Sequence, residues 1–127
     1  MTEKDYVTED VARKLREKGF NEKCRGYYYN GVFCFSCFHN EYNKTNNASL
    51  VSAPSLAQAA RWLRDEHAIW VTAFPEYDSL HELIVYRVRI TGFWNLLENK
   101  KGELLSLWFE KYEQALNAGL KEALEMI

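Results

Sequence analysis

The dipeptide Asn30-Gly31 is the strongest local constraint on how this sequence can fold. It separates the aromatic run 27–29 from the run 32–38, in which apolar residues dominate. Asn-Gly readily supplies positive φ at both central positions of a type I′ turn, which joins two antiparallel strands. We therefore predict a β-hairpin that pairs Tyr29 with Val32 and Tyr28 with Phe33. Both faces of this hairpin are rather apolar, so we expect one to pack on helices and the other to be half covered.

Three helices are predicted from apolar residues that recur with a period near 3.6. The first runs from about Glu9 to Lys18, with Thr8 as N-cap and Gly19 as the stop. The second begins after a capping box formed by Ser55 and Gln58, and has an apolar stripe of Leu56, Ala59, Ala60 and Leu63 beside Trp62. The third runs from about Tyr112 to Met126, with Tyr112, Leu116, Gly119, Leu120, Ala123 and Ile127 on one face. A glycine on an apolar helix face indicates that the backbone there comes close to a sheet or a ring.

The segment between the second and third helices has the two-residue period of strands. We predict a strand over Ile69–Phe74, stopped by Pro75, and a longer strand over Leu83–Thr91. A turn over Asn99–Gly102 then leads into a further strand, Leu104–Phe109. In the longer strand we expect Ile84, Tyr86, Val88 and Ile90 inward, and Leu83, Val85, Arg87, Arg89 and Thr91 outward.

Residues 39–50 contain four Asn and few apolar side chains, and we predict a loop there. The element order is therefore α-ββ-α-ββ(β)-α. We predict an α+β fold with an antiparallel sheet of about four to five strands and about three helices. A length of 127 residues is typical of a single domain, which we place at 1–127.

Composition excludes several classes of protein. With 16 Lys plus Arg against 18 Asp plus Glu, the formal net charge is −2, which argues against a dedicated nucleic-acid-binding protein. The longest apolar runs, such as Leu83–Tyr86, have four residues and are far short of a membrane span. Without a secretory signal, we expect the three cysteines to be reduced thiols in a cytoplasmic protein. No cofactor-binding motif occurs, so we expect no cofactor.

The spacing Cys34-x2-Cys37-x-His39, with Cys24 as a fourth residue, suggests a zinc site. In a regular strand, however, Cys34 and Cys37 lie on opposite faces and cannot share a metal unless a bulge intervenes. Small buried hydrophobic residues are the simpler interpretation. A cysteine nucleophile with His39, His67 or His81 as base has no supporting local motif. We therefore predict no metal ligands and no catalytic residues. For His67 we expect a helix-terminal histidine.

Two further patterns suggest binding. Arg87 and Arg89, on the outward face of the longer strand, could form a small cationic patch with Trp94, which suits a base or a phosphate. The alternative is a solvated strand face with cross-strand Glu partners. The 19 aromatic residues, counted from Trp 4, Tyr 8 and Phe 7, suggest either an aromatic-rich core or an exposed surface for a protein partner. Trp94 and Trp108 are the tryptophans we expect to be exposed.

Two segments carry a resemblance to a known family. Residues 52–67 contain Ser-Ala-Pro-Ser followed by Ala-Arg-Trp-Leu-Arg-Asp-Glu-His, and residues 112–124 contain Tyr-Glu-Gln-Ala-Leu, Gly-Leu and Glu-Ala-Leu. Together they resemble small uncharacterised Bacteroidetes proteins found in phage and mobile-element contexts. The resemblance implies a cytoplasmic α+β protein of unknown role and brings no catalytic residues. Gln114 departs from the acidic residue more usual at its position.

These observations favour a non-enzymatic accessory or interaction protein of phage or mobile-element origin. It would act through contacts with an unknown protein partner or as a homo-oligomer. The alternative is a small-ligand or nucleic-acid binding module that uses Arg87, Arg89 and Trp94. A metal or enzyme site built from the Cys and His residues of the hairpin is a third, weaker alternative.

Overall fold

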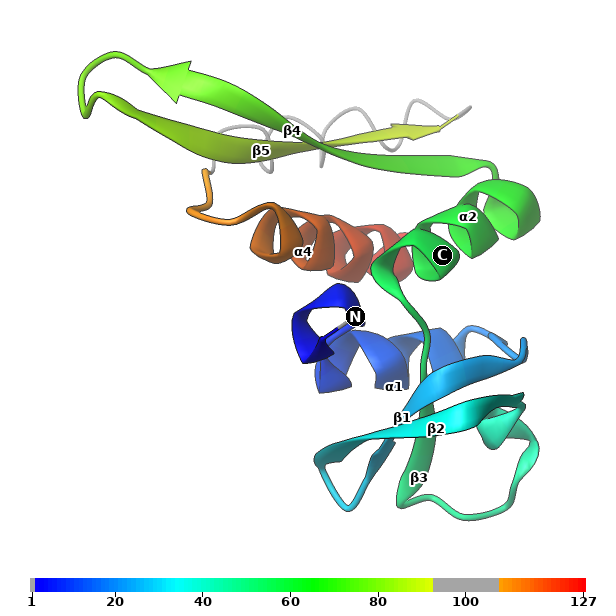
Figure 1. Ribbon diagram of the computed structural model, residues 1–127. Coiled ribbons are helices and arrows are strands. Elements are labelled where there is room, and N and C mark those ends of the chain that lie inside the picture. The colour runs from blue at the N-terminus through cyan, green and yellow to red at the C-terminus, as the bar shows by residue number, and fades with distance from the viewer. Residues whose placement is uncertain (1, 93–107) are drawn as a thin grey trace. The chain divides into compact units, whose positions relative to one another are not determined.

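The computed structural model describes residues 2–92 and 108–127 (Figure 1). Its described part contains three α-helices and five strands, so the predicted α+β class is confirmed. The strands are all antiparallel, in one sheet of three and one of two. The chain forms two compact units, Met1–Ala59 and Ala60–Ile127, each described by itself below.

The first unit opens with a short 3-10 turn, η1 (Glu3–Asp5), and the helix α1 (Glu9–Glu17). Thr8 occupies the N-cap as predicted, but its hydroxyl bonds the Asp10 carboxylate instead of capping a backbone N–H. The helix ends at Gly19, whose φ of +96° is the left-handed conformation that glycine adopts readily. Its inner face buries Val11, Ala12 and Leu15.

The predicted hairpin is confirmed. β1 (Cys24–Tyr29) pairs with β2 (Val32–Asn40) in the expected register, Tyr29 opposite Val32 and Tyr28 opposite Phe33. Asn30 and Gly31 have φ values of 51° and 80°, as a type I′ turn requires.

A third strand, β3 (Leu50–Ala53), lies on the other side of β1, so the sheet order is β2-β1-β3. The predicted loop over residues 39–50 is therefore too long, because β2 continues to Asn40 and β3 begins at Leu50. The remaining loop contains η2 (Tyr42–Lys44) and is tied to β3 by two reciprocal bonds. The Asn43 N–H donates to Ser52 Oγ at 3.1 Å, and the Ser52 N–H donates to Asn43 Oδ1 at 2.9 Å.

The helix α2 (Leu56–His67) starts where the capping box predicts. Ser55 Oγ accepts the Gln58 N–H at 3.1 Å. The Gln58 side chain, the other member of the predicted capping box, donates to the carbonyl of Lys23 at 2.9 Å. Near the end of the helix, Arg64 binds Asp65 at 3.2 Å. The buried residues of α2 are Leu56, Ala59, Trp62 and Leu63.

The second unit contains the hairpin of β4 (Ile69–Asp78) and β5 (Leu83–Gly92), paired from Ile69–Gly92 to Asp78–Leu83. The predicted stop at Pro75 is wrong, because β4 passes through it. Opposite Pro75, the Tyr86 N–H and C=O both bond Phe109, at 2.8 Å each, on the side away from β4. The Tyr86–Pro75 pair is therefore a non-hydrogen-bonded pair of the ladder, and the N–H that proline lacks would not have bonded β5.

The helix α4 (Tyr112–Glu125) packs along one face of this hairpin (Figure 1). The predicted close approach at Gly119 is confirmed, since a Cβ placed there would lie 2.4 Å from Val88 Cγ2 and 2.7 Å from Val71 Cγ1. The buried face of α4 differs slightly from the predicted one, because Ala115 and Leu124 are buried while Tyr112 is exposed.

Burial along β5 departs from simple alternation at two residues. Val85 lies on the face of Arg87, as predicted, but is buried rather than outward. Ile84 lies on the helix-facing side, yet it is 51% exposed because the end of the hairpin extends past α4 (Figure 1). Alternation decides which face a side chain takes, whereas the neighbouring elements decide whether it is covered.

The predicted turn Asn99–Gly102 and most of the predicted strand Leu104–Phe109 lie outside the described residues. Phe109 is described, and it forms an isolated antiparallel bridge with Tyr86. None of the helices in the described ranges is long and apolar enough to cross a membrane.

Candidate protein-interaction surface

The strand β2 carries the main exposed apolar surface of the first unit. The side chains of Val32, Phe35 and Phe38 are 62%, 45% and 75% exposed. Among the described strands, β2 pairs only with β1, so it is an edge of its sheet. Exposed apolar side chains therefore coincide with an open strand edge.

The side of the hairpin that carries Tyr28 is held in place by aromatic packing. The Tyr6 ring lies 5.2 Å from the Phe33 ring and 5.8 Å from the Phe35 ring, and Tyr28 packs on Phe33 at 5.5 Å. The Tyr28 hydroxyl donates to the Val7 carbonyl at 2.9 Å. Burial raises the pKa of Tyr28 to about 12, so it stays a neutral donor. The strand is thus anchored from one face while its edge is open.

Arg25 supports the middle of β2. Its guanidinium lies 4.3 Å above the centre of the Phe35 ring, and its Nε donates to the Ser36 carbonyl at 3.1 Å. The β1–β2 register shifts between Cys24 and Gly26, since Gly26 faces Phe35 while Cys24 faces Asn40. The regular part of β2 therefore runs from Val32 to Phe35.

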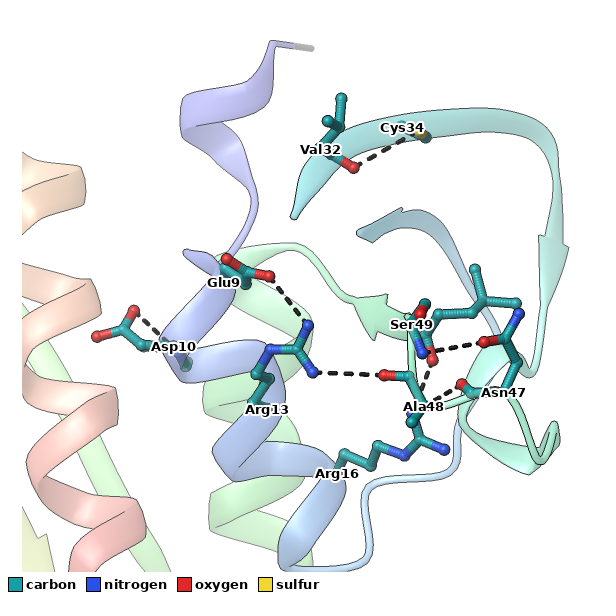
Figure 2. Close-up of polar contacts among 11 residues, drawn as sticks. Glu9, Asp10, Arg13, Arg16, Val32, Cys34, Asn47, Ala48 and Ser49 are labelled. Atoms are coloured by element: carbon teal, nitrogen blue, oxygen red, sulfur yellow. Dashed lines mark hydrogen bonds and ion pairs between the residues drawn. The ribbon is translucent and has the colours of Figure 1, made fainter. Parts of the chain in front are cut away.

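Two arginines of α1 bind the loop that leads into β3 (Figure 2). Arg16 donates to the carbonyls of Leu50 at 2.7 Å and of Asn47 at 3.3 Å. Arg13 reaches the Ala48 carbonyl at 3.5 Å and also pairs with Glu9 at 3.0 Å. These contacts hold β3 and its loop on the far side of β1 from the exposed edge.

The cysteines occupy three different environments. Cys24 is buried, and this burial raises the pKa of its thiol to about 11. Cys34 is half-buried, with its Sγ 3.6 Å from the Val32 carbonyl (Figure 2). Cys37 is exposed in the irregular part of β2. Among the described residues, no group of three His, Cys, Asp or Glu side chains could hold a metal ion.

The second unit has an apolar group at the end of the β4–β5 hairpin. Leu80 in the turn is 84% exposed, and Tyr77, Leu83 and Ile84 are exposed beside it. His81 Nδ1 lies 2.7 Å from Asp78 Oδ2, and this hydrogen bond lowers the pKa of Asp78. Asp78 at the end of β4 and Glu82 in the turn before β5 place acidic side chains beside this apolar group.

The structure places the predicted arginine patch on the face of β5 opposite α4. Arg87 Nε binds Glu76 Oε2 at 2.7 Å across the hairpin, which is the cross-strand Glu pairing of the simpler alternative. The Arg89 guanidinium lies 5.2 Å above the Phe74 ring. Trp94, the third residue predicted for this patch, lies outside the described residues.

Other predicted residues are placed as follows. His67 ends α2 and meets the Trp62 ring edge-on at 4.9 Å, and Trp108 is exposed, as expected. Sequence reasoning missed Phe38 and Leu80 as the most exposed large apolar side chains. The apolar pattern on both faces of residues 32–38 was the available signal for the first of these.

The exposed edge of β2 is thus the one place in the described part of the first unit where apolar side chains and unpaired backbone coincide. No protein-family model, curated protein or solved structure matches the chain, so comparison with known proteins does not indicate a function for this surface.

Proposed function

We propose that this chain is a non-enzymatic accessory protein that acts through protein–protein contacts. The observation that carries the proposal is the exposure of Val32, Phe35 and Phe38 along one strand. Single exposed apolar residues are ordinary. Here Val32 and Phe35 are exposed on opposite faces of one open strand, so apolar side chains border its unpaired edge on both sides. Aromatic residues are enriched in such surfaces because they bury a large area with few rotatable bonds.

The charge around this strand supports the same function. Residues 27–38 contain no Lys, Arg, Asp or Glu, and the Arg25 guanidinium beside them lies over the Phe35 ring. The cores of protein interfaces are depleted in charged residues, since each buried charge must be desolvated. The resemblance of residues 52–67 and 112–124 to phage-associated Bacteroidetes proteins supports an origin in a phage or mobile element.

Photo-crosslinking from β2 tests the proposal. A photoreactive phenylalanine analogue in place of Phe38 would sit at a 75% exposed position on the proposed surface. The same analogue in place of Glu17, exposed on α1, is the matched control. In cells that naturally produce the protein, we expect discrete covalent adducts from position 38 and none from position 17. Equal adduct patterns at the two positions, or none at either, would contradict a specific interaction surface on β2.

A further inference from the structure

We propose that the open edge of β2 binds β2 of a second copy of this chain, in antiparallel orientation, to form one continuous six-stranded sheet. This inference rests on the proposed function and names the partner. It follows from the direction of the backbone groups, from the side chains beside them, and from the symmetry of such a pairing.

The ladder of the first sheet shows which residues of β2 face outward. The Asn30 N–H donates to the Ser49 carbonyl at 3.0 Å, on the β3 side of β1. Backbone groups alternate sides along a strand, so Tyr29 bonds toward β2, and its partner Val32 bonds back toward β1. Phe33 and Phe35, one and three residues further on, therefore present their N–H and C=O groups to the open edge.

Two of the devices that commonly prevent strand addition, charged side chains and proline, are missing from this edge. The run 32–38 has neither, and the proposed pairing uses only its regular part, Val32–Phe35, before the register shift. Its side chains remain exposed on both sides of Cys34, at Val32 and Phe35.

A second copy satisfies the outward groups of the regular part of this edge. The occupant must be an extended, uncharged segment that is apolar on both faces, and β2 is itself such a segment. A twofold axis next to Cys34 sets Phe33 of each copy opposite Phe35 of the other. Each outward N–H and C=O of these two residues then finds a partner. The axis falls in the regular part of β2, before the register shift.

This register brings the two copies of Cys34 directly opposite each other in a non-hydrogen-bonded pair. Cβ atoms in such a pair lie roughly 4.5–5.5 Å apart, close to the separation that a disulfide spans. Cys34 therefore serves as a probe of the proposed pairing, and Cys37, in the irregular part of β2, is its internal control.

Mass measurement of the purified full chain under reducing conditions is the first test. We expect a species of twice the 15.0 kDa chain mass by light scattering and native mass spectrometry. Mild oxidation should crosslink the Cys37→Ser variant as a dimer through Cys34, and should crosslink the Cys34→Ser variant far less. A dimer that crosslinks equally well in both variants would overturn the proposed register.

A charge-swap experiment makes the test specific. Cys34→Lys and Cys34→Glu should each weaken dimerisation roughly tenfold or more, because like charges then meet at the axis. Mixing the two variants should restore a heterodimer. Tyr29→Lys, at an exposed position on β1 whose backbone already bonds β2, should leave the dimer intact. Far-UV circular dichroism shows whether each variant is folded.

The outcomes separate this inference from the proposed function. A wild-type chain that stays monomeric, yet crosslinks from position 38 to a different protein, overturns self-pairing and leaves the interaction function standing. A wild-type dimer that both charge variants leave intact overturns the β2 edge as its interface. A monomer without any crosslinked adduct from position 38 overturns both.

Discussion

Replacement of Gly119 by alanine tests the packing of α4 on its hairpin. An alanine Cβ at this position would lie 2.4 Å from Val88 Cγ2 and 2.7 Å from Val71 Cγ1. Both distances are well inside van der Waals contact. The two valines are β-branched, so their methyl groups have few alternative rotamers to move into. We therefore expect Gly119→Ala to destabilise the protein, although alanine is the better helix former.

Two opposing contributions set the magnitude. Helix propensity favours alanine over glycine by about 1 kcal/mol in a helix interior. Insertion of a methyl group into a filled core costs about 1–3 kcal/mol, and two simultaneous clashes place this site in the upper part of that range. The difference leaves a net loss of about 1–2 kcal/mol in the free energy of unfolding.

Urea unfolding followed by circular dichroism and tryptophan fluorescence measures this loss. Lys121, exposed in the interior of the same helix, provides the control. There, alanine should be more stable than glycine by about 1 kcal/mol, the propensity difference alone. Val88→Ala removes the nearest methyl group, so Gly119→Ala should cost less in that background, with a coupling of about 1 kcal/mol or more. An increase in stability for Gly119→Ala in the wild-type background would refute the close approach.

Three other predictions concern the loop, the thiols and the arginines. Arg16→Met should lower the free energy of unfolding by about 1–3 kcal/mol and speed amide exchange in the loop before β3, measured by hydrogen-exchange mass spectrometry. Folding raises the pKa of Cys24 from 9.0 to about 11, so the unfolded chain loses this proton first and stability should fall as pH rises between those values. Urea unfolding across this range should show a shallower fall in the Cys24→Ala variant, and iodoacetamide should modify Cys37 well before Cys24. If the chain were a nucleic-acid-binding module, the wild type would bind single-stranded DNA and the double variant Arg87→Glu, Arg89→Glu would not. We expect fluorescence anisotropy to show no binding by the wild-type chain.

The elements that the sequence predicts well are those coded by neighbouring residues. Asn30-Gly31 determines a turn by its own backbone preferences, and Gly19 ends α1 in the same way. The close approach at Gly119 was predictable because glycine weakens a helix, and it is tolerated on an apolar face mainly where a Cβ would not fit. These features need no knowledge of distant parts of the chain.

The features that the sequence does not predict depend on distant partners. β3 spans only four residues, too few for an alternating pattern, and it forms because β1 offers it an edge. The continuation of β4 through Pro75 depends on whether that residue faces β5 or away from it, which the ladder alone determines.

The candidate surface was predictable only in part. Apolar residues on both faces of the run 32–38 indicate a strand that is incompletely covered. Which edge stays open depends on the sheet order β2-β1-β3, and so on the unpredicted strand β3. Trp94, the aromatic residue that we expect in the arginine patch, lies outside the described residues.

Pro75 has a consequence for how many copies could assemble. Because Tyr86 directs its bonds away from β4, the backbone nitrogen of Pro75 points to the opposite, outer side of β4, where it offers no hydrogen to an incoming strand. The two long hairpins therefore differ in whether a sheet can grow from them, since β2 has no such block. Pairing through β2 would use this edge in both copies, and Pro75 disfavours strand addition at the outer side of β4, so we expect neither hairpin to offer a further edge for growth.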